Sequence, residues 1–234
     1  MSAAPTRSER VNQVLRWLAR RGSKRNRDGM ARYAIRAPKV FGVSMATMHS
    51  LAKRLGRDHD LAVALWKTGW YEARILTAFV DDPGRVTAAQ MDRWVKAFDN
   101  WAICDTICFH LFDKTPHAWR KVDQWSRRRE EFVKRAGFAL IASLAVHDKQ
   151  CPDAPFERSL RLIERAASDD RNFVKKAVSW ALRTTGRRNR RLHAKAVRTA
   201  RRLAASPLPS SRWIGKDAYR ELTSAAVVRR LATR

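Results

Sequence analysis

Apolar side chains recur at intervals of three and four residues along most of the chain, a spacing that predicts helices. The first series, Val11, Val14, Leu15 and Leu18, predicts an amphipathic helix that ends near Gly22. No stretch alternates apolar and polar residues as a half-buried strand would. Ala, Leu and Arg, all good helix formers, dominate, whereas there are only nine Gly and eight Pro residues. We therefore predict an all-α protein.

Capping residues and helix breakers divide the rest of the chain. After Gly22 we expect a basic link, a loop from Pro38 to Val43, and a helix that Ser44 caps. Asp82-Pro83-Gly84 is typical of a turn, and we interpret Ser210 to Lys216 as the turn into the last helix. The further helices are expected over residues 59–68, 71–80, 87–98, 101–112, 116–126, 129–146, 156–168, 170–184, 190–205 and 217–231.

Roughly a dozen helices joined by short turns are typical of an α-solenoid or a compact helical bundle. HEAT-like helical repeats fit the spacing best and predict a superhelix with a concave basic face, although no clean self-similar motif is visible. A four-helix bundle with a basic tail is the alternative. We expect one domain over residues 1–234, with residues 1–8 disordered and residues 206–234 forming a C-terminal helix and cap.

The charge of the chain is strongly unbalanced. There are 49 Lys and Arg residues against 22 Asp and Glu residues, which gives a formal net charge of +27. The segment from Arg171 to Lys216 contains fourteen of these basic residues and no acidic one. Such an excess indicates a polyanionic partner, and nucleic acid is the usual candidate because bound phosphates release counterions. A solvated basic surface is the alternative.

Two consecutive basic helices carry this segment. Phe173, Ala177 and Trp180 share one face of the first helix, although a single Trp at such a position more often packs in a core. Two basic helices in sequence favour a groove that follows a phosphate backbone. The candidate DNA-binding residues here are Lys175, Lys176, Arg183, Arg187, Arg188, Arg190 and Arg191.

A second constellation starts at Asn100, which can cap a helix, as can Asp99. Trp101 and Asp105 are four residues apart and therefore lie on one face of that helix. An acid inside an otherwise apolar helix is costly to bury without a partner, so Asp105 needs a cation. Taken alone, a capping or salt-bridged Asp is the simpler interpretation.

Together these motifs resemble the AlkD-type DNA alkylation repair glycosylases, from about residue 28 to about residue 205. Trp101 and Asp105 match the Trp and the catalytic Asp of that family. Trp180 lies in a close match to the family signature Phe-x-x-Lys-Ala-x-x-Trp-x-Leu-Arg. Arg135, with the adjacent Lys134 as a competitor, falls where the family has an Arg on a later helix, and Tyr33 lies in a segment similar to the family's N-terminal pattern.

The resemblance implies a fold of HEAT-like repeats and a monofunctional glycosylase acting on duplex DNA that contains N3-methyladenine or N7-methylguanine. Asp105 would stabilise the oxocarbenium-like transition state, and Trp101 and Trp180 would hold the cationic sugar or base. Arg135 would bind a backbone phosphate and Tyr33 the nearby duplex, without a tight base-flipping pocket. The alternatives are a non-catalytic HEAT-like binder of branched or damaged DNA and an RNA-binding helical protein.

Several other features complete the expectations. The three Cys residues form no CxxC pair, so we expect a reduced, cytoplasmic and nucleoid-associated protein without a metal site or a cofactor. The N-terminus lacks the apolar region of a signal peptide. The longest apolar run, Ala136 to Val146, is too short to span a bilayer, so no membrane association is expected. We expect a monomer.

Overall fold

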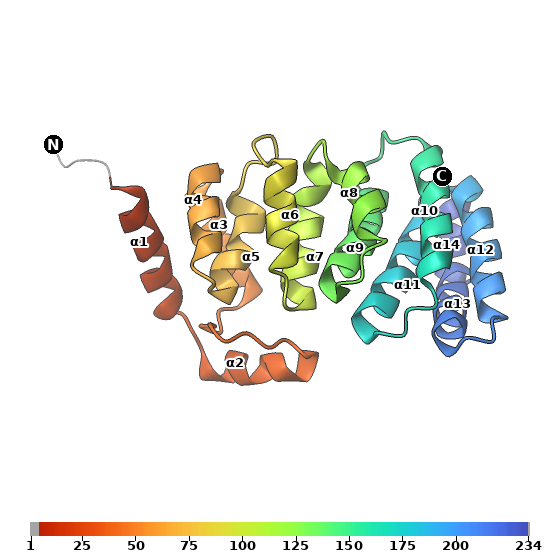
Figure 1. The fold of residues 1–234 in the computed structure, drawn as a ribbon, viewed down its shortest axis with the longest axis horizontal. Coiled ribbons are helices and arrows are strands. Elements are labelled where there is room, and N and C mark those ends of the chain that lie inside the picture. The colour runs from red at the N-terminus through yellow and green to blue at the C-terminus, as the bar shows by residue number, and fades with distance from the viewer. Residues whose placement is uncertain (1–4, 234) are drawn as a thin grey trace. The chain divides into compact units, whose positions relative to one another are not determined.

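The computed structural model of the chain describes residues 5–233, and within this range the ordered elements are helices, with no strand (Figure 1). The all-α prediction is confirmed. The described residues form two compact units, one ending at Pro116 and the other beginning at His117. The expectation of a single domain stays a prediction. No helix among the described residues is long and apolar enough to cross a membrane.

In the first unit, α5 is the central helix and packs against α3, α4 and α7. Helix α4 also contacts α6, because the rings of Trp66 and Trp94 stack with their centroids 4.2 Å apart. Ile75 and Leu76 of α5 are fully buried in the core. The elements of this unit are α1 (Arg7–Ala19), α2 (Lys24–Met30), the 3₁₀-helix η1 (Ala31–Tyr33), α3 (Met45–Leu55), α4 (His59–Lys67), α5 (Tyr71–Val80), α6 (Ala88–Lys96), α7 (Trp101–His110) and the 3₁₀-helix η2 (Phe112–Lys114).

In the second unit, α11 packs between α9 and α13, and α10 and α12 pack against it and against each other. At Gly215 a Cβ atom would lie 2.1 Å from the backbone nitrogen of Ala204, so the backbones of α12 and α13 touch there. The elements of this unit are α8 (Ala118–Trp125), α9 (Glu131–His147), α10 (Asp153–Ala166), α11 (Asn172–Gly186), α12 (Arg190–Ala204), α13 (Pro209–Leu222) and α14 (Ala225–Ala232).

The N-terminal segment is more ordered than predicted. Residues 1–4 lie outside the described residues, but the expectation of disorder up to residue 8 is wrong, because α1 begins at Arg7. Thr6 and Glu9 form a capping box, in which the Glu9 N–H donates to the Thr6 hydroxyl at 3.2 Å and the Thr6 N–H donates to the Glu9 carboxylate at 2.7 Å. The expected basic link is also helical, since Ser23 caps α2.

The C-terminal segment differs from the prediction in a similar way. Instead of one helix over residues 217–231, the chain forms α13 from Pro209 and then α14. Proline suits the first turn of a helix because the backbone N–H it lacks would have no intrahelical partner there. The turn expected from Ser210 to Lys216 is therefore helical, and this places Trp213 on a helix surface.

Candidate catalytic helix and nucleic-acid interface

Helix α7 presents the predicted catalytic pair as expected. The side-chain oxygen of Asn100 accepts a hydrogen bond from the backbone N–H of Ile103 at 3.0 Å, so Asn100 is the cap. Trp101 and Asp105 are one turn apart and both are half-buried, whereas Cys104 is fully buried. The Asp105 carboxylate therefore lies where the apolar core of the unit meets solvent. Its catalytic role stays a prediction.

The structure brings Trp101 and Tyr33 together, although they are far apart in the sequence. The indole N–H of Trp101 donates to the backbone carbonyl of Tyr33 at 2.8 Å. The Tyr33 residue itself is 68% exposed, so its ring is available to a ligand. This contact also anchors the Trp101 ring, because the indole has only one N–H donor. Two of the predicted site residues thus form one surface on the first unit.

The buried Cys108 thiol of α7 does not provide a nucleophile. Burial raises the pKa of the Cys108 thiol well above its usual value, and the neighbouring Cys104 and Asp105 raise it further. The thiolate is the reactive form of cysteine, so Cys108 stays protonated and inert at neutral pH. No group of three His, Cys, Asp or Glu residues in the described part of the chain could hold a metal ion.

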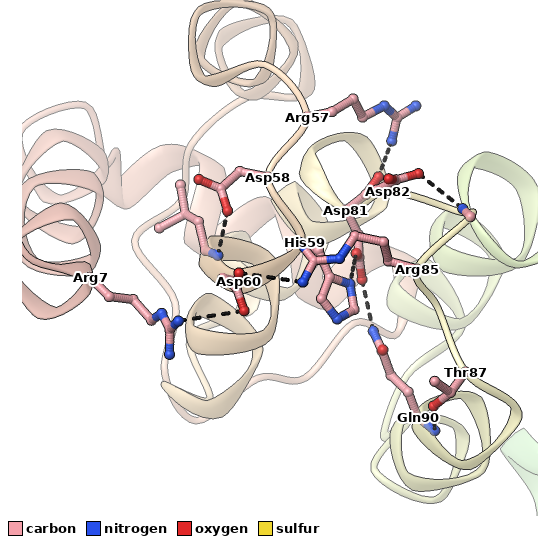
Figure 2. Close-up of polar contacts among 12 residues, drawn as sticks. Arg7, Arg57, Asp58, His59, Asp60, Asp81, Asp82, Arg85, Thr87 and Gln90 are labelled. Carbon is pink, nitrogen blue, oxygen red and sulfur yellow. Dashed lines mark hydrogen bonds and ion pairs between the residues drawn. The ribbon is translucent and has the colours of Figure 1, made fainter.

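The buried carboxylate of Asp81 has a structural role, because its hydrogen-bond partners are side chains of the same unit. Figure 2 shows His59 and Gln90 directed at it, with the His59 Nδ1 atom 2.7 Å from one oxygen and the Gln90 amide nitrogen 2.8 Å from the other. Burial raises the pKa of Asp81, and the hydrogen bond to His59 opposes that rise. Asp81 is 0% exposed, so no ligand reaches it, and it joins the loop after α5 to α4 and α6.

In the second unit, Arg135 and Lys134 make contacts within the protein. Arg135 is only 6% exposed, and its guanidinium donates to the backbone carbonyl of Phe173 at 2.6 Å, which joins α9 to α11. The Lys134 ammonium lies 2.8 Å from the Asp169 carboxylate. Hydrogen bonds from Arg171 and from Lys134 hold the pKa of Asp169 below its usual value. The predicted phosphate contact of Arg135 stays a prediction.

A ladder of polar contacts joins α11 to α13. The Ser179 hydroxyl donates to Asp217 at 2.7 Å, and Arg183 lies 3.6 Å from the same carboxylate. Arg183 also pairs with Glu221, which lies 3.1 Å from Arg187. The four-residue spacing on both helices keeps these groups on facing surfaces. The acids of α13 therefore neutralise two cations of the segment that has no acid of its own.

The cations at the start of α12 have protein partners as well. Arg191 and Lys195 lie 3.1 Å and 2.6 Å from the Glu157 carboxylate of α10. Arg188 donates to the carbonyl of Cys151 at 2.5 Å, and Arg190 donates to the carbonyl of Leu231 at 2.9 Å. Each contact crosses to another helix or loop of the same unit. DNA binding by these arginines stays a prediction.

Lys175 of α11 faces an aromatic residue of α13 instead of an acid. The Lys175 ammonium lies 5.0 Å from the centre of the Trp213 ring, within the range of a cation–π contact. Trp213 is 39% exposed, and Lys176 is also exposed. Lys176 is one turn before the half-buried Trp180, on the same face of α11. We call Lys175, Lys176, Trp180 and Trp213 the α11–α13 surface.

Sequence reasoning missed Trp213, because Ser210 to Lys216 was interpreted as a turn. A signal was present, since Trp213, Asp217 and Glu221 follow one another at the helical interval of four residues. A Pro two residues before Ser211 is also typical of a helix start. The series indicates a helix whose surface carries an aromatic ring followed by two acids.

Comparisons with known proteins agree with this architecture. The uncharacterized protein Lin0241 of Listeria innocua is 21% identical over 165 residues, which cover 69% of this chain and 71% of the relative. A solved structure aligns with this chain with a TM-score of 0.75 and 22% sequence identity. The alignment covers 90% of this chain and 94% of the chain in that structure. That structure represents a new family of proteins related to the HEAT-like repeat DNA glycosylases with affinity for branched DNA structures.

The match in structure confirms the prediction of a HEAT-like all-α fold. The model of a family described as DNA alkylation repair enzyme matches residues 14–222, which include every predicted site residue. This match extends beyond the resemblance from about residue 28 to about residue 205, because it takes in the C-terminal part of α1 and the whole of α13. The chain belongs to the DNA alkylation repair enzyme family.

Proposed function

We propose that this protein is a monofunctional DNA glycosylase that removes cationic alkylated purines, such as N3-methyladenine and N7-methylguanine, from duplex DNA. The observation that carries the proposal is the half-buried carboxylate of Asp105, one turn after a half-buried Trp101, on a capped helix. Membership of the DNA alkylation repair enzyme family supports the same chemistry.

The reaction breaks the bond between C1′ of the deoxyribose and the purine nitrogen. An alkylated purine already carries a positive charge, so it departs with the bonding electron pair as a neutral base and needs no protonation. Positive charge then develops on the sugar, and the fixed Asp105 carboxylate stabilises it. Removal of one such electrostatic contact costs roughly 3–4 kcal/mol of barrier in other enzymes. Water adds to C1′ and releases a proton to Asp105 or to solvent.

The Trp101 ring, on the same helix as Asp105, supports recognition of this positive charge. Trp101 is half-buried, so it offers part of its ring to a ligand, and Trp180 of the second unit is likewise half-buried. A cation over an indole gains about 0.5–2 kcal/mol, depending on how far it is desolvated. On the α11–α13 surface, Lys175 and Lys176 are placed to bind backbone phosphates, and the exposed Trp213 ring packs against a deoxyribose.

The test is the release of methylated bases from methylated duplex DNA, separated by chromatography. We expect wild type to release N3-methyladenine or N7-methylguanine, and Asp105→Asn to release them at least about 100-fold more slowly. Asp99→Asn is the matched control, because Asp99 is adjacent to the same helix and its side chain is 45% exposed. Equal rates for wild type and Asp105→Asn would exclude Asp105 from the chemistry.

The second candidate function is binding of branched DNA without base excision. It is favoured by one observation, the affinity for branched DNA described for the protein with the matching fold. A direct comparison of four-way junctions with linear duplex of the same length separates the two functions. Tight junction binding without any base release supports the binder, whereas base release that depends on Asp105 supports the enzyme.

A further inference from the structure

An open groove of about 860 Å³ lies in the first unit, beside the exposed Tyr33. Its floor is apolar, since Val43, Met48 and Tyr71 are all buried. The rim contains the ion pair of Lys24 with Asp28, and also Arg25 and Arg32, for which the described residues provide no carboxylate partner, so the rim is cationic on balance. An apolar floor under a cationic rim suits a ligand that combines a flat apolar body with negative charge.

The backbone segment that carries Val43 is firmly attached to the core. The buried Glu72 carboxylate accepts hydrogen bonds from the backbone N–H groups of Phe41 at 3.0 Å, Gly42 at 2.6 Å and Val43 at 3.2 Å. On the other side, the Asn26 amide donates to the Gly42 carbonyl at 2.9 Å, which fixes α2 to the same segment. Figure 1 shows α2 running across the ends of its neighbours in this unit. The groove is therefore a built feature.

The backbone beside Tyr33 adopts a costly conformation. Ala34 has a φ angle of 54°, in the left-handed region that residues other than Gly, Asn and Asp rarely adopt. The turn is closed by hydrogen bonds from the Ala34 N–H to the Ala31 carbonyl at 3.0 Å and from the Ile35 N–H to the Met30 carbonyl at 3.1 Å. This turn leaves the Tyr33 ring exposed at the groove, and such conformations cluster at ligand sites.

We propose that this groove binds an unpaired nucleotide of a DNA strand. The base stacks on the Tyr33 ring and covers the Met45 side chain, which is 42% exposed, while Arg25 and Arg32 bind the flanking phosphates. A paired duplex presents its bases only at their edges, so it cannot fill the apolar floor. This inference rests on the proposed function, because it requires a DNA ligand.

The contact between Trp101 and the Tyr33 carbonyl links the groove to the candidate catalytic helix. A nucleotide stacked on the Tyr33 ring contacts the same residue whose backbone carbonyl holds the Trp101 indole. Stacking of one base on an aromatic side chain is worth about 1–3 kcal/mol, which corresponds to roughly 5- to 150-fold in affinity. We therefore expect a preference of about tenfold, toward the lower end of this range, for DNA with an unpaired base.

The experiment compares a duplex carrying one unpaired 2-aminopurine with the fully paired duplex of the same length. Wild type should bind the former about tenfold more tightly and change its fluorescence, because stacking alters the emission of 2-aminopurine. Tyr33→Ala should lose the preference and the fluorescence change. Arg25→Gln should reduce the preference more than Arg16→Gln, the matched control on α1, whose side chain is also exposed.

The outcomes separate this inference from the proposed function. If paired duplex is bound and methylated bases are released, but the unpaired base brings no preference, the groove has another role. Equal effects of Arg25→Gln and Arg16→Gln would mean that only net charge matters, and would also overturn the proposal. Failure of both DNA ligands to bind would remove the proposed function as well. Thermal melting of each variant establishes that it is folded.

Discussion

Replacement of Lys175 and Lys176 together should weaken DNA binding and its dependence on salt, whereas replacement of Arg183 should do neither. In the free protein Arg183 is paired with Asp217 and Glu221, whereas Lys175 lies against the Trp213 ring. A phosphate that approaches Arg183 also meets two carboxylates, which repel it. A phosphate that approaches Lys175 and Lys176 meets Trp213 on α13, where the other facing positions carry Asp217 and Glu221.

The size of the effect follows from counterion release. Each phosphate contact contributes about 0.9 to the slope of log K against log salt concentration, so Lys175→Gln with Lys176→Gln should lower the slope by about 1.8. Between about 50 and 200 mM salt, wild type should then lose about twelvefold more affinity than the double variant. Arg183→Gln should leave the slope unchanged and cost about 1 kcal/mol of folding stability, because its ion pairs are partly exposed.

The assay is a titration of labelled duplex by fluorescence anisotropy at several salt concentrations. Thermal melting of each variant in parallel shows whether the loss lies in binding or in folding. The reasoning is refuted if Arg183→Gln lowers the slope as much as one lysine substitution does. It is equally refuted if the double lysine variant keeps the wild-type slope.

Three further predictions concern the fold that supports the site. Gly215→Ala should destabilise the protein by about 1–3 kcal/mol, because its Cβ would meet the Ala204 backbone, and chemical denaturation measures this loss. Asn100→Ala should cost about 1 kcal/mol and slow any base release, because it removes the cap of α7; denaturation together with the methylated-DNA assay shows whether both change. The lowered pKa of Asp169 means that its ion pairs stabilise the fold above the ordinary Asp pKa near 3.9 and that this stability is lost as pH falls further. In Asp169→Asn the free energy of unfolding should therefore fall less steeply as the pH is lowered below about 4. The same steepness as in wild type, measured by denaturation at several acidic pH values, would contradict a stabilising role for the Asp169 ion pairs.

Helices could be predicted from the sequence because their signals are local. The apolar spacing of 3.6 residues and caps such as Ser44 and Asn100 act within one or two turns, and both caps are present in the structure. The errors arose where a local signal has two meanings. Pro209 can end a helix or begin one, and the structure shows that it begins α13. Thr6 and Glu9 likewise form a capping box in a segment predicted to be disordered.

The placement of Trp101 and Asp105 one turn apart could be predicted because both residues belong to one helix, where about four residues make one turn. The contact between Trp101 and Tyr33 could not, because it joins segments separated by 68 residues in sequence. The groove was missed for the same reason, since Glu72 of α5 holds the segment from Phe41 to Val43 in place. Long-range polar contacts of this kind leave no periodic trace in the sequence.

The segment from Arg171 to Lys216 illustrates how charge in sequence differs from charge in space. It contains no acid, yet Glu157 and Glu164 of α10 and Asp217 and Glu221 of α13 pair with five of its cations. An ion pair that already exists must be disturbed or shared when a phosphate arrives, so these cations gain less from DNA than cations without an acidic partner. The density of basic residues therefore indicates the class of partner, and the placement of the acids indicates where that partner binds. By this criterion the α11–α13 surface, with Lys175, Lys176 and Trp213, is the part of the segment best suited to the DNA backbone.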